Sequence, residues 1–219
     1  MLFRSMNLEQ ARNTFKYFLA PTLFQMVSEV RAAWQRQWLQ MLHQTAIVLR
    51  ELHDHKIQHN DIKPSNIMIT TPLFTQELIE PKVRLIDLGF GCMVHNNGNE
   101  APKCGHQPPG GTKDYIAPEI DQDAWKPNGK ADIYALGKVW EFLCKPALSS
   151  QQQNNSLVLW SSAAEVASHK FIRLLDHMTA TAPEERPGLD EITRRMANLI
   201  AWTYSYPKIV FLKIGRAHV

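Results

Sequence analysis

The most informative stretch of the chain reads His59-Asn60-Asp61-Ile62-Lys63-Pro64-Ser65-Asn66. It follows a segment with helical periodicity and precedes a short apolar run, so we expect it to be a loop. The loop carries an aspartate, a lysine two residues later and an asparagine three residues after that. Phosphoryl transfer needs a carboxylate to orient the attacking hydroxyl, cations to offset phosphate charge and oxygen ligands for magnesium. The side chains of this loop are suited to that chemistry.

The loop resembles the protein kinase catalytic loop H-R-D-x-K-P-x-N, with Asn60 where arginine is usual. Further motifs follow in the order of that family. Residues 87–89 resemble the magnesium-binding D-F-G, with leucine for phenylalanine, and residues 111–119 resemble G-T-x-x-Y-x-A-P-E. Residues 132–137 resemble the start of the long buried helix, and Arg186 stands where the family places the partner of the A-P-E glutamate. Each motif alone is weak, but the ordered set is typical of eukaryotic-type protein kinases.

Hydrophobic periodicity outside the loop favours helices. Apolar residues recur at helical spacing over residues 22–54, again after Asp132, and finally around 189–202. Residues 67–70 and 83–86 are short runs rich in β-forming residues. The pattern predicts a mainly helical α+β protein with a few short strands around the catalytic loop. The resemblance implies the C-terminal lobe of a protein-kinase-like fold.

The resemblance also predicts how the chain is divided. Residues 1–21 are expected to be a linker before the lobe, residues 22–202 the lobe itself and residues 203–219 a tail. Residues 214–219 resemble the translation of a common sequencing adapter. No glycine precedes Gly89, so the chain has no place for a Gly-rich phosphate loop upstream of the catalytic loop. We therefore expect the N-terminal lobe to be missing and this chain alone to be inactive.

The resemblance implies a role for each matching residue. Asp61 would orient the substrate hydroxyl and accept its proton, and Lys63 would neutralise charge on the transferred group of ATP. Asn66 and Asp87 would hold Mg²⁺, and Met68 would lie under the adenine ring. Taken singly, either aspartate could instead form a turn, and Met68 could instead be a core methionine.

Other matching positions are expected to be structural. His59 and Leu88 would be packing residues. Glu119 and Arg186 would form a buried ion pair, and Asp132 would anchor the backbone of the catalytic loop.

Residues 63–66 and Thr112 resemble the serine/threonine branch of the family. The resemblance therefore implies a serine/threonine kinase with a protein substrate. The alternative is a catalytically inactive pseudokinase that serves as an interaction scaffold.

Asn60 suggests an unusual mode of activation, because the arginine it replaces receives an activating phosphate in the family. Between Asp87 and Glu119 the only hydroxyl side chains are Thr112 and Tyr115, and both belong to the closing motif. We expect an enzyme that does not require phosphorylation of this segment.

Composition narrows the remaining choices. The net charge is +3 and apolar residues make up 44% of the chain, which gives no indication of binding to nucleic acid or a membrane. Three cysteines are too few for a disulfide framework, so we expect a reduced, intracellular protein, cytoplasmic or nuclear. A zinc site at Cys92, His95, Cys104 and His106 is the alternative to a solvated loop with scattered thiols.

Overall fold

The computed structural model describes residues 6–11, 28–71, 80–94, 103–104, 111–121, 128–144 and 165–205. Its long helices are α2 (Ser28–Asp54), α4 (Lys130–Cys144), α5 (Glu165–Met178) and α6 (Leu189–Ser205). The short helical turns are η2 (Pro64–Asn66), α3 (Pro118–Asp121) and η3 (Pro183–Glu185). The strands are β1 (Met6–Asn7), β2 (Ile57–Gln58), β3 (Ile67–Ile69), β4 (Val83–Leu85), β5 (Cys92–Met93) and β6 (Lys103–Cys104). The predicted mainly helical content is confirmed. Within the described ranges, no helix is long and apolar enough to cross a lipid bilayer.

The predicted elements lie close to the observed ones. Helix α2 covers residues 28–54 of the predicted 22–54, whose first residues lie outside the described ranges. Strands β3 and β4 confirm the two predicted β runs. Helix α4 begins two residues before Asp132, and α6 extends to Ser205 rather than Trp202.

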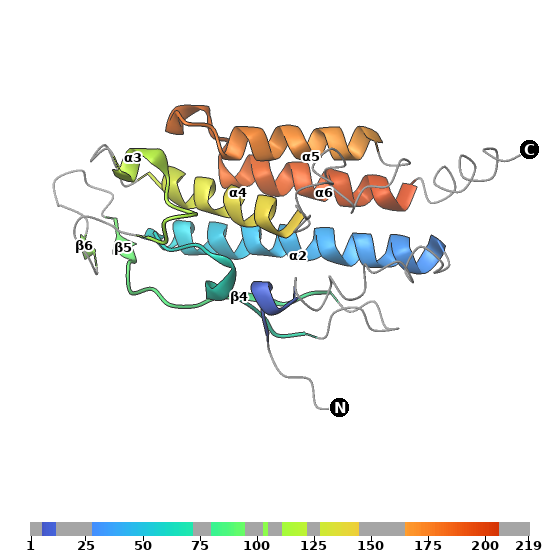
Figure 1. The fold of residues 1–219 in the computed structure, drawn as a ribbon, viewed down its shortest axis with the longest axis horizontal. Helices are drawn as coiled ribbons and strands as arrows, with labels where there is room; N and C mark the ends of the chain where they lie inside the picture. The colour runs from blue at the N-terminus through green and yellow to red at the C-terminus, as the bar shows by residue number, and fades with distance from the viewer. Residues whose placement is uncertain are drawn as a thin grey trace, which may run out of the picture.

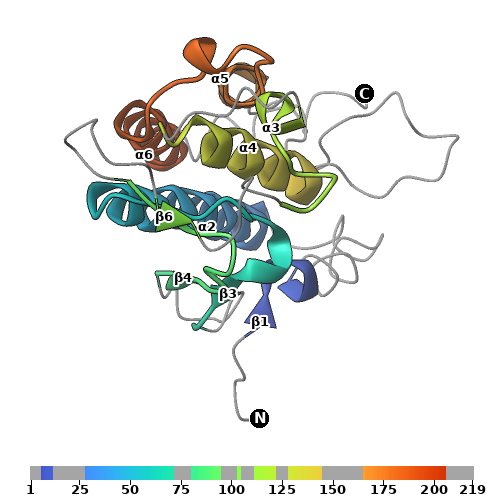
Figure 2. The same cartoon turned by 90° about the vertical axis from the view of Figure 1, so that its left-hand side faces the viewer.

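Helix α2 runs through the middle of the molecule (Figure 1). Helices α4, α5 and α6 lie on one side of it, and strands β1, β3 and β4 lie on the other, as the perpendicular view confirms (Figure 2). Helix α6 packs on α2, and α5 packs on both α4 and α6. Strands β1, β3 and β4 are therefore separated from the α5–α6 pair by α2.

One hydrophobic core joins these helices, because each presents an apolar stripe at helical spacing. Trp140 of α4 is at its centre and is fully buried. Its indole Nε1 donates to Thr45 Oγ1 of α2 over 3.0 Å, and its ring stacks on Phe171 of α5 with centroids 6.0 Å apart. A buried indole nitrogen needs an acceptor, so Thr45 is the polar partner that lets tryptophan occupy the core.

Two small antiparallel sheets flank the catalytic loop. Strands β1, β3 and β4 form the first, with Met6 opposite Ile69 and Ile67 opposite Leu85. Strands β2, β5 and β6 form the second. Because β2 precedes the loop and β3 follows it, each sheet fixes one end of residues 59–66. Within the segment predicted to precede the lobe, Leu8 and Ala11 are buried in the core.

The cysteines of the second sheet are paired. Cys92 of β5 and Cys104 of β6 form a disulfide, with their Cα atoms 4.0 Å apart. The expectation of reduced cysteines is therefore wrong for this pair, and neither sulfur is available as a thiolate ligand for zinc. His95 and His106 lie outside the described residues. The described residues contain no group of three or more His, Cys, Asp or Glu placed to hold a metal ion.

Candidate active site

Asp132 holds the backbone of the catalytic loop. Its Oδ2 accepts from the backbone N–H of His59 over 2.8 Å, and its Oδ1 accepts from the N–H of Asn60 over 2.7 Å. His53, at the end of α2, contacts Oδ2 through Nε2 at 2.8 Å. The carboxylate has 1% of its surface exposed. These bonds confirm the predicted anchoring role and fix Asn60 in a left-handed conformation, with φ of 60°.

The pKa of the Asp132 carboxyl is below its ordinary value. Burial alone would raise this pKa, because desolvation disfavours the charged form. The hydrogen bonds and charge of His53, together with the backbone N–H groups of His59 and Asn60, outweigh burial and favour the carboxylate. The anchor of the loop is therefore an ionised group.

Gly129 makes room for this arrangement at the start of α4. Its φ is 73°, and a Cβ at this position would lie 2.6 Å from Cε1 of His53. Any side chain here would displace the imidazole from Asp132. The absence of a Cβ lets α4 begin directly against the end of α2.

His59 is a buried structural residue, as predicted. Its Nδ1 accepts from the backbone N–H of Asp61 at 3.3 Å, so its Nε2 carries the proton and donates to the carbonyl oxygen of Ile86 at 3.0 Å. The ring joins the catalytic loop to the segment that follows β4.

The side chains of Asp61, Lys63, Asn66 and Thr112 form one cluster. Lys63 Nζ lies 2.7 Å from Asp61 Oδ2 and donates to Thr112 Oγ1 at 3.1 Å. The Thr112 hydroxyl donates to Asp61 Oδ1 at 2.8 Å. Asn66 Nδ2 donates to Asp61 twice, to Oδ2 at 3.0 Å and to the carbonyl oxygen at 2.9 Å. The Asp61 residue is 4% exposed, so the cluster holds its carboxylate in one orientation.

Backbone contacts hold Ile86, the residue before Asp87, against the catalytic loop. The N–H of Ile86 donates to the carbonyl oxygen of Asn66 at 3.0 Å, while His59 binds the carbonyl of Ile86. The next residue, Asp87, has φ of 65°, and its Oδ1 accepts from the N–H of Gly89 at 3.2 Å. Its carboxylate is exposed.

The donor set at Asn66 and Asp87 fits magnesium. Since the Nδ2 atom of Asn66 is occupied with Asp61, its amide oxygen faces away from that residue and makes no hydrogen bond within the described part of the chain. Asp87 adds an exposed carboxylate. Carboxylate and amide oxygens are the ligands that Mg²⁺ prefers.

Met68 lies on the surface of β3 that faces away from the core. Successive side chains of a strand point to opposite faces, and the two neighbours of Met68, Ile67 and Ile69, are fully buried. Met68 itself is only partly buried and pairs with Asn7 and Arg84 in the sheet. The strand geometry favours a surface or ligand-facing role over a core role.

Leu88 departs from its predicted packing role. It is 48% exposed, and Ile86 is 41% exposed. Both lie beside Asp87, so the region around the candidate magnesium ligands is bordered by accessible apolar side chains.

Asn60 occupies the position of the usual arginine, and its side chain forms a hydrogen bond within the protein. Its Nδ2 donates to the carbonyl oxygen of Phe90 at 3.1 Å, which ties the loop to the segment after Asp87. Its Oδ1 is buried without a hydrogen-bond partner among the described residues. The uncharged side chain therefore connects the catalytic loop to the segment after Asp87 through a hydrogen bond.

Of the predicted residues Asp61, Lys63, Asn66 and Asp87, the structure brings the first three into direct contact. Asp87 directly follows Ile86, whose N–H donates to the Asn66 carbonyl. Sequence reasoning missed the contact of Thr112 with Asp61, although a hydroxyl in the closing motif was the available signal. It also missed His53, for which only its place at the end of a predicted helix offered a signal. The predicted ion pair of Glu119 and Arg186 is confirmed, with contacts of 2.6 Å and 2.7 Å.

Comparison with known proteins agrees with this geometry. Residues 6–196 match the protein kinase domain family. The chain is 30% identical over 177 residues to the serine/threonine-protein kinase Nek5 of Homo sapiens, which covers 76% of this chain. It is 30% identical over 183 residues to the kinase Nek1 of Mus musculus, which covers 79%. It is also 24% identical over 162 residues to the interferon-induced, double-stranded RNA-activated protein kinase of Rattus norvegicus, which covers 73% of this chain.

The matched regions are small parts of these relatives, amounting to 23% of Nek5, 14% of Nek1 and 29% of the rat kinase. That the chain is the C-terminal lobe alone stays a prediction. The family match spans most of the chain and includes every catalytic-loop residue described above. The chain therefore belongs to the eukaryotic-type serine/threonine protein kinase family.

Proposed function

We propose that these residues form the catalytic and metal-binding part of an enzyme that transfers a phosphoryl group from ATP to serine or threonine hydroxyls of proteins. The observation that carries the proposal is the Asp61 cluster. A buried carboxylate is held by Lys63, Thr112 and Asn66. Phosphoryl transfer depends on positioning and electrostatics, and this cluster fixes both a proton acceptor and a cation.

Asp61 accepts the proton of the substrate hydroxyl in this proposal. Its hydrogen bonds to Asn66 and Thr112 set the direction of the carboxylate before substrate arrives. Lys63, about a quarter exposed, supplies positive charge next to Asp61 and offsets charge on the transferred group. ATP supplies the phosphoryl group when it is bound.

Asn66 and Asp87 would hold Mg²⁺ through their oxygen atoms, and the partly buried Met68 would lie against the adenine. Support for this pairing comes from the backbone hydrogen bond between Asn66 and Ile86, the residue that directly precedes Asp87. Both candidate ligands adjoin the strand pair β3–β4, because Asn66 directly precedes β3 and Asp87 lies just after β4.

The enzyme would not need phosphorylation of residues 87–119. In the place of a phosphate-binding arginine, Asn60 already binds the Phe90 carbonyl. Of the two hydroxyl side chains in that segment, Thr112 is engaged with Asp61 and Lys63. Phosphatase treatment should leave activity unchanged, and a loss of activity mapped to this segment would contradict this part of the proposal.

The test compares the whole native protein with its Asp61→Asn variant, using radiolabelled ATP and a serine-containing peptide. Loss of the proton acceptor should lower kcat by about 10²- to 10⁴-fold. The exposed Asp176, on α5, offers a matched control, and Asp176→Asn should retain full activity. A peptide with tyrosine in place of serine tests the hydroxyl preference. Equal, measurable rates for wild type and Asp61→Asn would refute the role of Asp61, and absence of phosphoryl transfer by wild type would favour the scaffold alternative.

A further inference from the structure

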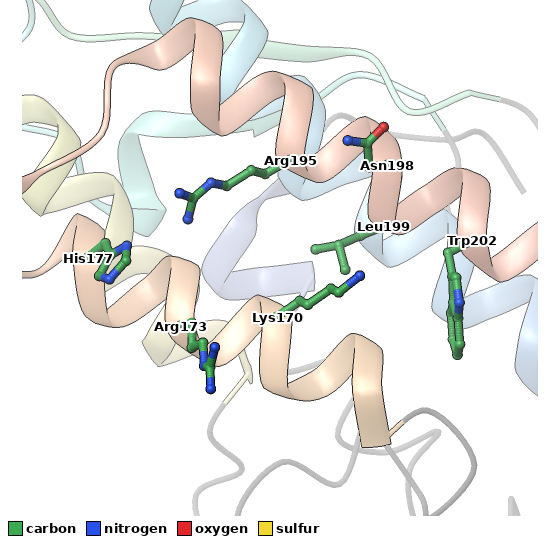
Figure 3. Close-up of a pocket in the computed structure, with 7 residues that line it drawn as sticks. All are labelled: Lys170, Arg173, His177, Arg195, Asn198, Leu199 and Trp202. Carbon is green, nitrogen blue, oxygen red and sulfur yellow. The ribbon is translucent and has the colours of Figure 1, made fainter.

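A groove of about 380 Å³ lies between helices α5 and α6, away from the candidate active site (Figure 3). In the perpendicular views, α5 and α6 lie on the opposite side of α2 from β3 and β4 (Figures 1 and 2). None of the site residues described above lines it. The lining residues are Lys170, Arg173, His177, Arg195, Asn198, Leu199 and Trp202.

The groove is built by two facing helical stripes. Its α5 side chains are spaced by three and four residues, and so are those of α6, which places each set on one face of its helix. Arg195 extends from α6 toward α5, and Leu199 projects into the space between the helices (Figure 3). The two stripes therefore form one continuous surface.

The walls of the groove are basic. Lys170 and Arg173 are exposed, and no carboxylate of the described residues forms an ion pair with either. Arg195 pairs with Glu191, one helical turn earlier. The surface has more positive than negative charge facing the open space.

The floor is apolar. Leu199 is 5% exposed at the bottom of the groove, and the partly buried Trp202 forms one end. An apolar floor between cationic walls is complementary to a ligand that combines carboxylates with an apolar side chain.

We infer that this groove binds an acidic peptide segment of a partner protein, with an aliphatic or aromatic side chain against Leu199 and Trp202. Seven residues of helix extend about 10 Å, and an extended peptide advances about 3.3 Å per residue. The groove therefore accepts about three residues of such a peptide. This interaction goes beyond the proposed function, because it requires neither nucleotide nor phosphoryl transfer.

Charge argues for a partner rather than for a neighbouring part of this chain. The sequence of residues 145–164, before α5, contains no aspartate or glutamate. The sequence of residues 206–219, after α6, contains none either and includes three lysines or arginines. Neither segment is complementary to basic walls.

The test is fluorescence anisotropy of the full chain with a labelled, end-capped peptide Glu-Asp-Leu-Glu-Asp-Leu. Its matched control is Gln-Asn-Leu-Gln-Asn-Leu, which has nearly the same shape but no charge. We expect saturable binding of the acidic peptide with a Kd below about 1 mM, and binding of the neutral peptide that is weaker by at least about tenfold. Added salt should weaken the binding of the acidic peptide, because salt screens charge.

Two charge-reversal variants locate the site. Lys170→Glu/Arg173→Glu should weaken binding at least about tenfold, because two attractive charges become repulsive. Lys82→Glu/Arg84→Glu makes the same change in net charge at two exposed residues around β4, and should bind like wild type apart from a small general effect. All these substituted side chains are exposed, so melting temperatures should stay near that of wild type. Absent saturable binding, equal affinity for both peptides, or equal weakening by both variants would each overturn the inference.

Discussion

Arg186 is a full charge in the interior, with the residue only 1% exposed. Its five N–H donors all have acceptors: Glu119 takes two through both carboxylate oxygens, and the carbonyls of Ala180, Lys130 and Thr181 take the others. Tyr134 adds a ring face 5.0 Å from the guanidinium carbon. Arginine is the only side chain with this fork of donors, so no other residue can satisfy the site.

Arg186→Ala should therefore be strongly destabilising. The substitution leaves Glu119 buried without its partner, which typically costs about 3–5 kcal/mol. For a chain of this size the melting temperature should fall by roughly 10 °C, measured by circular dichroism. Arg195→Ala, which removes an arginine from an accessible ion pair on α6, should change stability by less than about 1 kcal/mol.

The double variant Glu119→Gln/Arg186→Met, compared with its two single variants, separates the energy of the ion pair from the energy of side-chain packing. Removing both charges leaves no stranded ion, so the double variant should lose less stability than the sum of the single losses. Additive losses, or an unchanged melting curve for Arg186→Ala, would contradict the importance of the pair.

The sequence could predict the contacts of residues whose role only one type of side chain can fill. The contacts of Asp132 and Arg186 could be predicted because the surrounding motif specifies one residue type at each position. Thr112 and His53 could not be assigned their contacts, because a hydroxyl or an imidazole occurs in many environments and only the folded chain brings them to Asp61 and Asp132. The exposure of Leu88 likewise depends on what surrounds it.

At the scale of elements, the contact between α4 and the end of α5 depends on Gly137. A Cβ there would lie 2.8 Å from Thr179 Cγ2 and 3.0 Å from Met178 Cβ. Met178 is fully buried, so the neighbouring backbone would have to move. The helices approach closely because this position has no side chain.

Gly137→Ala should destabilise the protein although alanine favours helices. The gain in helix propensity is about 1 kcal/mol, whereas overpacking of a tight contact typically costs about 1–3 kcal/mol. We expect the free energy of unfolding to fall by about 1 kcal/mol, as measured by urea denaturation.

Gly188→Ala is the matched control, because a Cβ at Gly188 meets nothing within 4 Å. This change should be neutral or stabilising by up to about 1 kcal/mol, through lower entropy of the unfolded chain. A Gly137→Ala variant as stable as Gly188→Ala would show that the α4–α5 contact can relax freely.

The elements differ in how far the sequence could predict them. Helices α2, α4 and α6 have long apolar stripes that tertiary contacts only reinforce. Strands β1, β5 and β6 are two residues each, too short to show any alternation. Their pairing, and the Cys92–Cys104 disulfide within it, depends on chain segments that meet only in the folded protein. The α5–α6 groove is likewise visible only once both helices are placed together.

At the scale of the whole molecule, Asp132 joins helix α4, helix α2 through His53, and the catalytic loop through His59 and Asn60. The same carboxylate therefore supports both the packing of the helices and the position of the active-site backbone. Because its pKa is lowered in the folded state, folding favours its ionised form. Its contribution to stability is present above the unfolded pKa of about 4 and is lost as pH falls through the folded pKa.

Asp132→Asn should therefore lower stability at pH 7, with a smaller difference from wild type in acid. At neutral pH the variant replaces an acceptor-only carboxylate by an amide whose N–H₂ faces other donors, so we expect a loss of about 3 kcal/mol or more. Urea denaturation of both proteins between about pH 7 and pH 3 measures the difference at each pH and cancels the titration of other carboxyls. Asp176→Asn, at an exposed position on α5, should differ little from wild type throughout. A difference between wild type and Asp132→Asn that stays constant down to pH 3 would mean that the loop and the two helices are held together by shape rather than by the charge of Asp132.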